Sequence, residues 1–126
     1  MSILTAFNKQ LYNLVNNLSD MFPEDPDLQF SKNTVSFLKK SNPRKLQKIF
    51  SEYVAIYKNQ INTEDDDFFL TKNFISEDLD FDSNHYSNDI MKNLKKYWHL
   101  IDTESRKNIW KYLKVLIILN DKCNNA

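Results

Sequence analysis

The chain has 126 residues, a formal net charge of zero and no glycine. Its length suits one ordinary domain with a substantial core, so we expect a single helical domain over residues 1–126. Phosphate-binding loops and dinucleotide fingerprints need glycine for close backbone approach and are excluded, and hairpin-rich β folds are disfavoured because tight hairpins need positive φ.

Apolar residues at three- and four-residue steps predict a first helix over residues 2–21. Ser2 or Thr5 is suited to cap its start, and Pro23 and Pro26 end it because proline cannot continue the hydrogen-bond ladder. The apolar stripe consists of Ile3, Leu4, Phe7, Leu11, Leu14, Val15 and Leu18, with Phe22 beyond its end.

A second helix is predicted from Asp25 to about Lys40, with Pro26 in its first turn and Asp27 near the positive end of the helix dipole. Its thinner apolar stripe is marked by Leu28, Val35 and Leu38. The break before the next helix is short, so these two helices are expected to be neighbours.

The stretch 42–61 is predicted to be the central core helix, amphipathic over about five turns. Asn42 is expected to cap it, and Pro43 suits its first position. The apolar face carries three aromatic residues and is formed by Leu46, Ile49, Phe50, Tyr53, Tyr57 and Ile61. The other helices are expected to pack around this face.

Residues 62–86 lose helical periodicity and are predicted to form an acidic, partly irregular segment. Its aromatic residues are expected to pin it to the bundle, with one or two single-turn helices. The range 64–89 holds nine acidic residues against one base, Lys72, so the rest of the chain carries a compensating charge of +8. Local fields of both signs are therefore expected.

Two C-terminal helices are predicted, from Ser87 to about Ile101 and from Thr103 to about Asp121. The joint at Asp102 is so short that they are expected to form an antiparallel hairpin. Their apolar stripes consist of Ile90, Met91, Leu94, Tyr97, Trp98 and Ile101, and of Ile109, Trp110, Leu113, Leu116, Ile117 and Leu119. Together the elements predict an all-α fold, a single compact bundle of about five helices.

The single cysteine, Cys123, excludes an internal disulfide and a cysteine-based metal cluster, and it fits a reducing compartment. The longest apolar run, Val115–Leu119, is far shorter than the ~20 residues that span a bilayer. The N-terminus also lacks the basic start and long apolar stretch of a secretory signal. We therefore expect an intracellular protein with no membrane partner.

One helix start departs from the usual charge pattern. Arg44 and Lys45 lie in the first turn of the 42–61 helix, where acidic residues are preferred. Five cations are expected to converge there, and we call this set the basic corner: Lys39, Lys40, Arg44, Lys45 and Lys48. A helix N-terminus with arginine and lysine suits an anion or an acidic partner. The simplest alternative is that the acidic stretch 64–82, or solvent, neutralises these charges.

An alternating acidic run superficially resembles a calcium loop, with oxygen ligands at Asp78, Asp80, Asp82, Asn84 and Asp89. Its sixth position is a serine where the sharp turn of that loop requires glycine, and no helix is predicted to lead into it. A solvated acidic loop is favoured, and no metal site is expected.

Six stretches have a distinctive sequence, at residues 22–25, 42–46, 50–61, 65–70, 94–98 and 109–113, among them NPRKL, DDDFFL, LKKYW and IWKYL. In these stretches the chain resembles a family of small uncharacterised helical proteins of nucleocytoplasmic large DNA viruses. The resemblance covers nearly the whole chain. It implies a viral protein that acts in the host cytoplasm or is packaged in the virion, and it implies no activity and no functional residues.

His85 and His99 belong to no nucleophile motif, so the sequence predicts no catalytic residue and no cofactor. The leading prediction is a non-enzymatic protein-interaction or structural module that binds a protein partner or a second copy of itself. One alternative is a weak, sequence-independent binder of nucleic acid or another polyanion. The other is an enzyme whose site the sequence does not show.

Overall fold

The computed structural model describes residues 2–71 and 94–125, and every regular element in these ranges is a helix. The elements are α1 (Ile3–Met21), α2 (Pro26–Ser41), α3 (Pro43–Tyr53), the 3-10 helix η1 (Ala55–Tyr57), α4 (Lys58–Asn62), α5 (Asp66–Thr71), the 3-10 helix η2 (Trp98–Leu100) and α7 (Thr103–Asn124). Residues 94–97 are also helical and lead into η2. The prediction of an all-α fold is confirmed.

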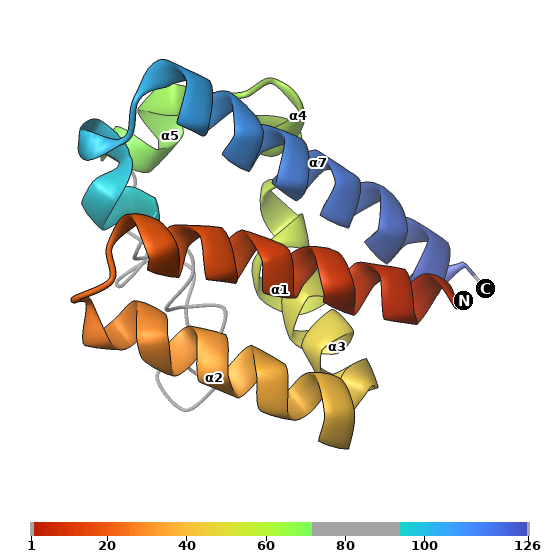
Figure 1. The fold of residues 1–126 in the computed structure, drawn as a ribbon. Helices are drawn as coiled ribbons and strands as arrows, with labels where there is room; N and C mark the ends of the chain where they lie inside the picture. Colours follow the sequence, from red (N-terminus) through yellow and green to blue (C-terminus); the bar gives the residue numbers. More distant parts are fainter. Residues whose placement is uncertain (1, 72–93, 126) are drawn as a thin grey trace.

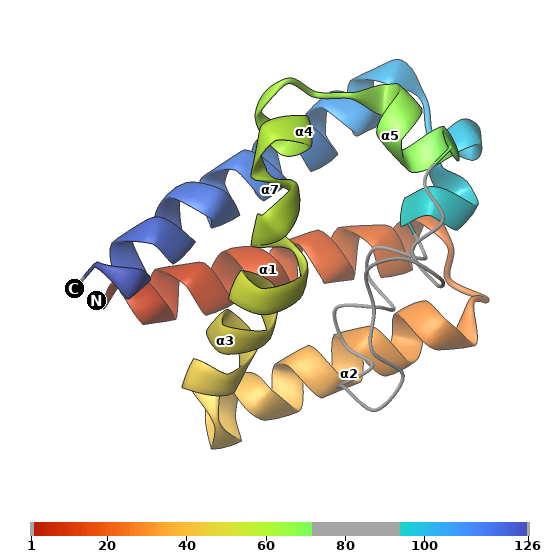
Figure 2. The ribbon, with the colours of Figure 1, turned by 180° about the vertical axis from the view of Figure 1, so that it is seen from behind.

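The helix α1 occupies the middle of the bundle, with α2 on one side and α7 on the other (Figure 1). The run from α3 through η1 to α4 crosses α1 on the opposite face and reaches from α2 to α7 (Figure 2). The prediction that the stretch 42–61 is the central helix is therefore wrong. The first helix takes that place because its buried side chains face three neighbouring helices, α2, α3 and α7.

The stretch 42–61 is also not one continuous helix. Its first part, α3, packs on α1, α2 and α7, whereas α4 packs mainly on α7, so the apolar face has to change direction between them. The tighter 3-10 turn makes this change, burying Val54 and Tyr57 while Ile56 stays exposed. The predicted core positions whose side chains are described are nevertheless buried: Leu46, Ile49, Phe50, Tyr57 and Ile61.

Side-chain caps set the starts of α1 and α7. The Ser2 hydroxyl accepts a hydrogen bond from the Thr5 N–H at 3.0 Å, which starts α1 as predicted. The Asp102 carboxylate accepts from the Ser105 N–H at 2.7 Å and caps α7. The start of α7 at Thr103 is as predicted, but Asp102 was not predicted as its cap. The expected fraying after Asp121 does not occur, because α7 continues to Asn124.

Buried amides join α3 to α7. The Gln47 Nε2 donates to Asn120 Oδ1 at 2.7 Å and to Asn124 Oδ1 at 3.0 Å. Gln47 and Asn120 are both buried, so each polar group needs the other as a partner. This contact fixes the position of α3 against the C-terminal half of α7.

The acidic segment contributes α5, which agrees with the expected short helix in residues 62–86. Phe68 is buried beside Tyr57, and one oxygen of Asp66 accepts hydrogen bonds from Trp98 Nε1 at 3.2 Å and Trp110 Nε1 at 3.1 Å. These contacts attach α5 to the start of the C-terminal region. The predicted hairpin begins at Ser87, so residues 87–93 of its first arm lie outside the described residues, and residues 94–101 lie inside them.

Candidate functional site

The basic corner lies at the junction of α2 and α3. Lys39 and Lys40 belong to the last turn of α2, Arg44 and Lys45 to the first turn of α3, and Lys48 follows one turn later. Lys40, Arg44 and Lys48 are exposed, and Lys39 and Lys45 are half-buried. The single residue between the two helices brings these charges to one end of the bundle.

In the ranges 2–71 and 94–125, no carboxylate lies within ion-pair distance of any of these five cations. Two acids at the start of the acidic segment are used elsewhere, because Glu64 pairs with Lys114 and Asp66 accepts from the two indoles. The alternative that residues 64–82 neutralise the corner thus receives no support from these two acids. Residues 72–82 lie outside the described structure.

The N-terminus of α3 has no acidic partner of its own. Asn42 stands at the cap position with φ −153° and ψ 71°, and its side chain makes no capping hydrogen bond, contrary to the prediction. The first turn contains no acidic residue. The positive end of the helix dipole therefore adds to the charges of Arg44 and Lys45.

A cavity of about 520 Å³ adjoins the corner, between the first half of α1 and the start of α3. Its lining includes Lys9 and Tyr12 from α1, Lys39 from α2 and Pro43 from α3. The Lys39 Nζ lies 4.9 Å from the centre of the Tyr12 ring, a cation–π distance. Lys39 belongs to both the cavity and the basic corner, so the two are adjacent.

Asn8 is the buried polar residue of this cavity, and its side chain is 1% exposed. Its Nδ2 donates to the Pro43 carbonyl oxygen at 3.1 Å, whereas its Oδ1 accepts no hydrogen bond from any residue that the structure describes. An unsatisfied buried acceptor costs about 1–3 kcal/mol, so this oxygen lowers the stability of the fold. The sequence does carry a signal for it, since Asn8 interrupts the apolar stripe between Leu4 and Leu11.

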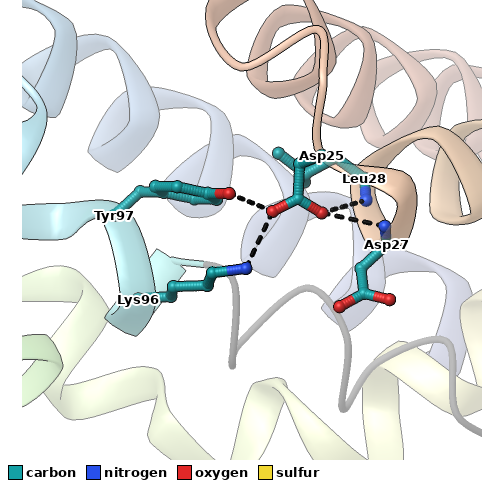
Figure 3. A network of polar contacts seen from close by, with 5 residues as sticks. All are labelled: Asp25, Asp27, Leu28, Lys96 and Tyr97. Carbon is teal, nitrogen blue, oxygen red and sulfur yellow. Dashed lines mark hydrogen bonds and ion pairs between the residues drawn. The ribbon is translucent and has the colours of Figure 1, made fainter.

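A second polar cluster closes the turn between α1 and α2 (Figure 3). The Asp25 carboxylate, 2% exposed, accepts from the backbone N–H groups of Asp27 at 2.8 Å and Leu28 at 3.1 Å. It also accepts from Lys96 Nζ at 2.9 Å and from the Tyr97 hydroxyl. We call these groups the Asp25 cluster. It ties residues 96–97 to the start of α2.

Charge and hydrogen bonding in the Asp25 cluster favour the ionised carboxylate. Burial raises the pKa of Asp25, but the hydrogen bonds from Tyr97, Lys96 and the two backbone N–H groups outweigh burial and lower this pKa to about 2. The bond to Asp25 also raises the pKa of Lys96. The sequence predicts Asp25 as the start of the second helix, but no local signal pairs it with side chains about 70 residues later.

The histidines and the calcium-like run of the sequence are not among the described residues of these two clusters. His99 is exposed, and the calcium-like positions and His85 lie outside the described residues. Within the described ranges, no group of three or more histidine, cysteine or acidic side chains is arranged to hold a metal ion. No described helix has the length and apolar character needed to cross a membrane.

Comparisons with known proteins give no further assignment. No protein-family model matches the chain, and searches of curated proteins and of solved structures find no match.

Proposed function

We propose that this protein is a non-enzymatic interaction module whose basic corner binds an acidic segment of a partner protein. The observation that carries the proposal is the set of five cations at the uncapped start of α3, none of which has a carboxylate partner among the described residues. Following the family resemblance, we place this interaction in the infected cell or the virus particle.

A protein partner is favoured over nucleic acid by the size and surroundings of the corner. Nucleic-acid binders commonly neutralise 6–10 phosphates along a strand, whereas this corner offers only five cations at one junction of a chain with zero net charge. Phe37 is 68% exposed and lies one turn before Lys40 on α2. Aromatic residues and arginine are enriched at protein interfaces, so Phe37 and Arg44 favour a protein partner.

The Asp25 cluster supports a non-enzymatic role. Asp25 is the described carboxyl whose pKa is lowered furthest, and four donors already occupy its oxygens. A carboxylate with a pKa near 2 is a poor proton acceptor at neutral pH, because general bases work best with a pKa near the working pH. The cluster is therefore better suited to holding the fold than to proton transfer.

The proposal is tested with a fluorescein-labelled peptide of eight glutamates, whose binding is followed by fluorescence anisotropy at low and moderate salt. We expect salt-sensitive binding that weakens at least about tenfold in the triple variant Lys40→Glu, Arg44→Glu, Lys45→Glu. The charge-matched control reverses Lys32, Lys107 and Lys111, which lie away from the corner.

Three outcomes would contradict this proposal. They are no binding by the parent protein, equal weakening in the two triple variants, and tighter binding of a single-stranded DNA of equal charge. The last result would instead favour the nucleic-acid alternative.

A further inference from the structure

A second surface lies between α1 and α7, which run side by side in opposite directions (Figure 1). Two adjacent cavities of about 330 and 410 Å³ lie there, lined only by residues of these two helices. Asn17, Asn108 and Tyr112 line both cavities, and Asn17 Nδ2 donates to the Tyr112 hydroxyl at 2.9 Å. We call this surface the α1–α7 groove. None of the five cations of the basic corner lines it.

The side chains around the groove have the composition of a protein interface. Among its 19 residues α1 has only two charged side chains, Lys9 and Asp20, although 27% of the whole chain is charged. Met21 lines the first cavity and Val115 the second, and both are exposed apolar side chains. Interface cores are depleted in charge and enriched in methionine and tyrosine. The groove is therefore suited to contact with another protein surface.

Two charges give the groove a direction. Asp20 lines the cavity at the Met21 end, and Lys111 lines the cavity at the Val115 end. Both are exposed, and neither makes an ion pair with any residue that the structure describes. Asp20 belongs to α1 and Lys111 to α7, so the two charges lie on opposite walls as well as at opposite ends.

This arrangement is complementary to itself. A twofold axis through the middle of the groove, near Asn17 and Tyr112, exchanges both its ends and its walls. It places Asp20 over Lys111 of the partner subunit, and the symmetry forms the same pair a second time. The same axis places Met21 over Val115 of the partner subunit. A second copy of the chain thus supplies both the charges and the apolar groups that the groove needs.

We propose that the α1–α7 groove binds a second copy of this chain in a twofold-symmetric dimer with two Asp20–Lys111 pairs. A face as long as α1 and two helices wide covers roughly 550 Å² per subunit. Because a standard interface covers about 800 Å² per subunit, the dimer is weak and reversible, with a Kd on the order of 10–100 µM. It goes beyond the proposed function and leaves the basic corner accessible to its partner.

The test is a charge exchange, followed by sedimentation equilibrium of the full chain at low and moderate salt. We expect Asp20→Lys and Lys111→Asp each to weaken the dimer at least about tenfold, because each reversal creates two like-charge pairs. An equimolar mixture of the two variants is expected to dimerise within about threefold of the parent, since both of its contacts join a lysine to an aspartate.

The matched control uses Lys48→Asp and Glu52→Lys, two exposed positions on α3 that do not line the groove. Each control variant and their mixture are expected to dimerise like the parent. Circular dichroism checks the folding of every variant.

A parent protein that is still monomeric at about 1 mM overturns the dimer, and this measurement needs no variant. Dimerisation that is unchanged by either reversal, or a mixture no tighter than its single variants, also overturns it. Assemblies larger than a dimer contradict the twofold axis, because a twofold interface closes. The control for the octaglutamate test reverses Lys111, so it is expected to be monomeric and still to bind that peptide. The two proposals therefore fail separately.

Discussion

The starts of α2 and α3 have the same local sequence pattern and opposite outcomes. Each has an Asp or Asn at the cap position followed by proline. At α2, Asp25 caps two N–H groups and is held in turn by Lys96 and Tyr97. At α3, Asn42 makes no side-chain cap, and the first turn carries Arg44 and Lys45 in place of an acid.

This difference separates a helix start that holds the fold together, at α2, from one that we propose as a binding surface, at α3. A carboxylate neutralises the positive end of the α2 dipole, so little field remains there for a ligand. At the start of α3, the positive end of the helix dipole and the positive charges of the side chains add together, and both attract an anion from solvent. The two starts can therefore be tested against each other, with stability as the readout for α2 and binding for α3.

The largest effect is expected for Asp25→Ala, which removes the cap of α2 and leaves the Tyr97 hydroxyl without its acceptor. We expect the free energy of unfolding to fall by about 3 kcal/mol, measured by urea denaturation at pH 7. Asp27→Ala, in the same turn but exposed, is the control and is expected to cost about 0.5 kcal/mol. Equal losses in the two variants would show that the Asp25 cluster is not a structural joint.

The second effect is the pH dependence of stability. The folded pKa of Asp25 is about 2 against an ordinary value of 3.8, so ionised Asp25 stabilises the fold above about pH 4. This contribution, about 2 kcal/mol, is lost as the pH falls from 4 toward 2. Thermal unfolding measured over this range should show a smaller drop in the unfolding temperature on acidification for Asp25→Asn than for the parent. If the unfolding temperatures of the two proteins fall in parallel with pH, the lowered pKa of Asp25 is contradicted.

The smallest effect is expected for Asn42→Asp, which gives α3 the acid that α2 already has. Stability should rise by about 0.5 kcal/mol because the new charge faces the helix dipole. Affinity for the octaglutamate peptide should fall about threefold because the same charge repels the ligand. Asn42→Ser, which adds no charge, is the control. Unchanged binding by Asn42→Asp would place the binding surface away from the start of α3.

Local signals in the sequence predicted the starts of α1 and α2. Ser2 and Asp25 accept hydrogen bonds from N–H groups within three residues, so each cap and its partners lie in one short stretch of sequence. The same signal failed at Asn42, which makes no side-chain cap. The buried stripe of α7 was also predictable, because the 3.6-residue period of its apolar residues is a local property of the sequence.

Features that depend on distant contacts could not be predicted in this way. The turn at Val54 arises because α3 packs on α1, α2 and α7 whereas α4 packs mainly on α7, and no local pattern in residues 42–61 encodes this change. The pairing of Asp25 with Lys96 joins residues far apart in the chain. Asn8 and Lys9 join the basic corner only because α1 packs against the junction of α2 and α3. The convergence of charge was visible in sequence, and the cavity beside it was not.

The shared contact of Asp66 with two indoles gives the molecule a natural optical reporter. The chain contains two tryptophans, and both donate to the same carboxylate oxygen on α5. Its intrinsic tryptophan emission therefore comes from one place, and detachment of α5 would remove the shared acceptor from both indole N–H groups together. Movement of this short helix can be followed in the unlabelled protein, whatever happens at the opposite end of the bundle.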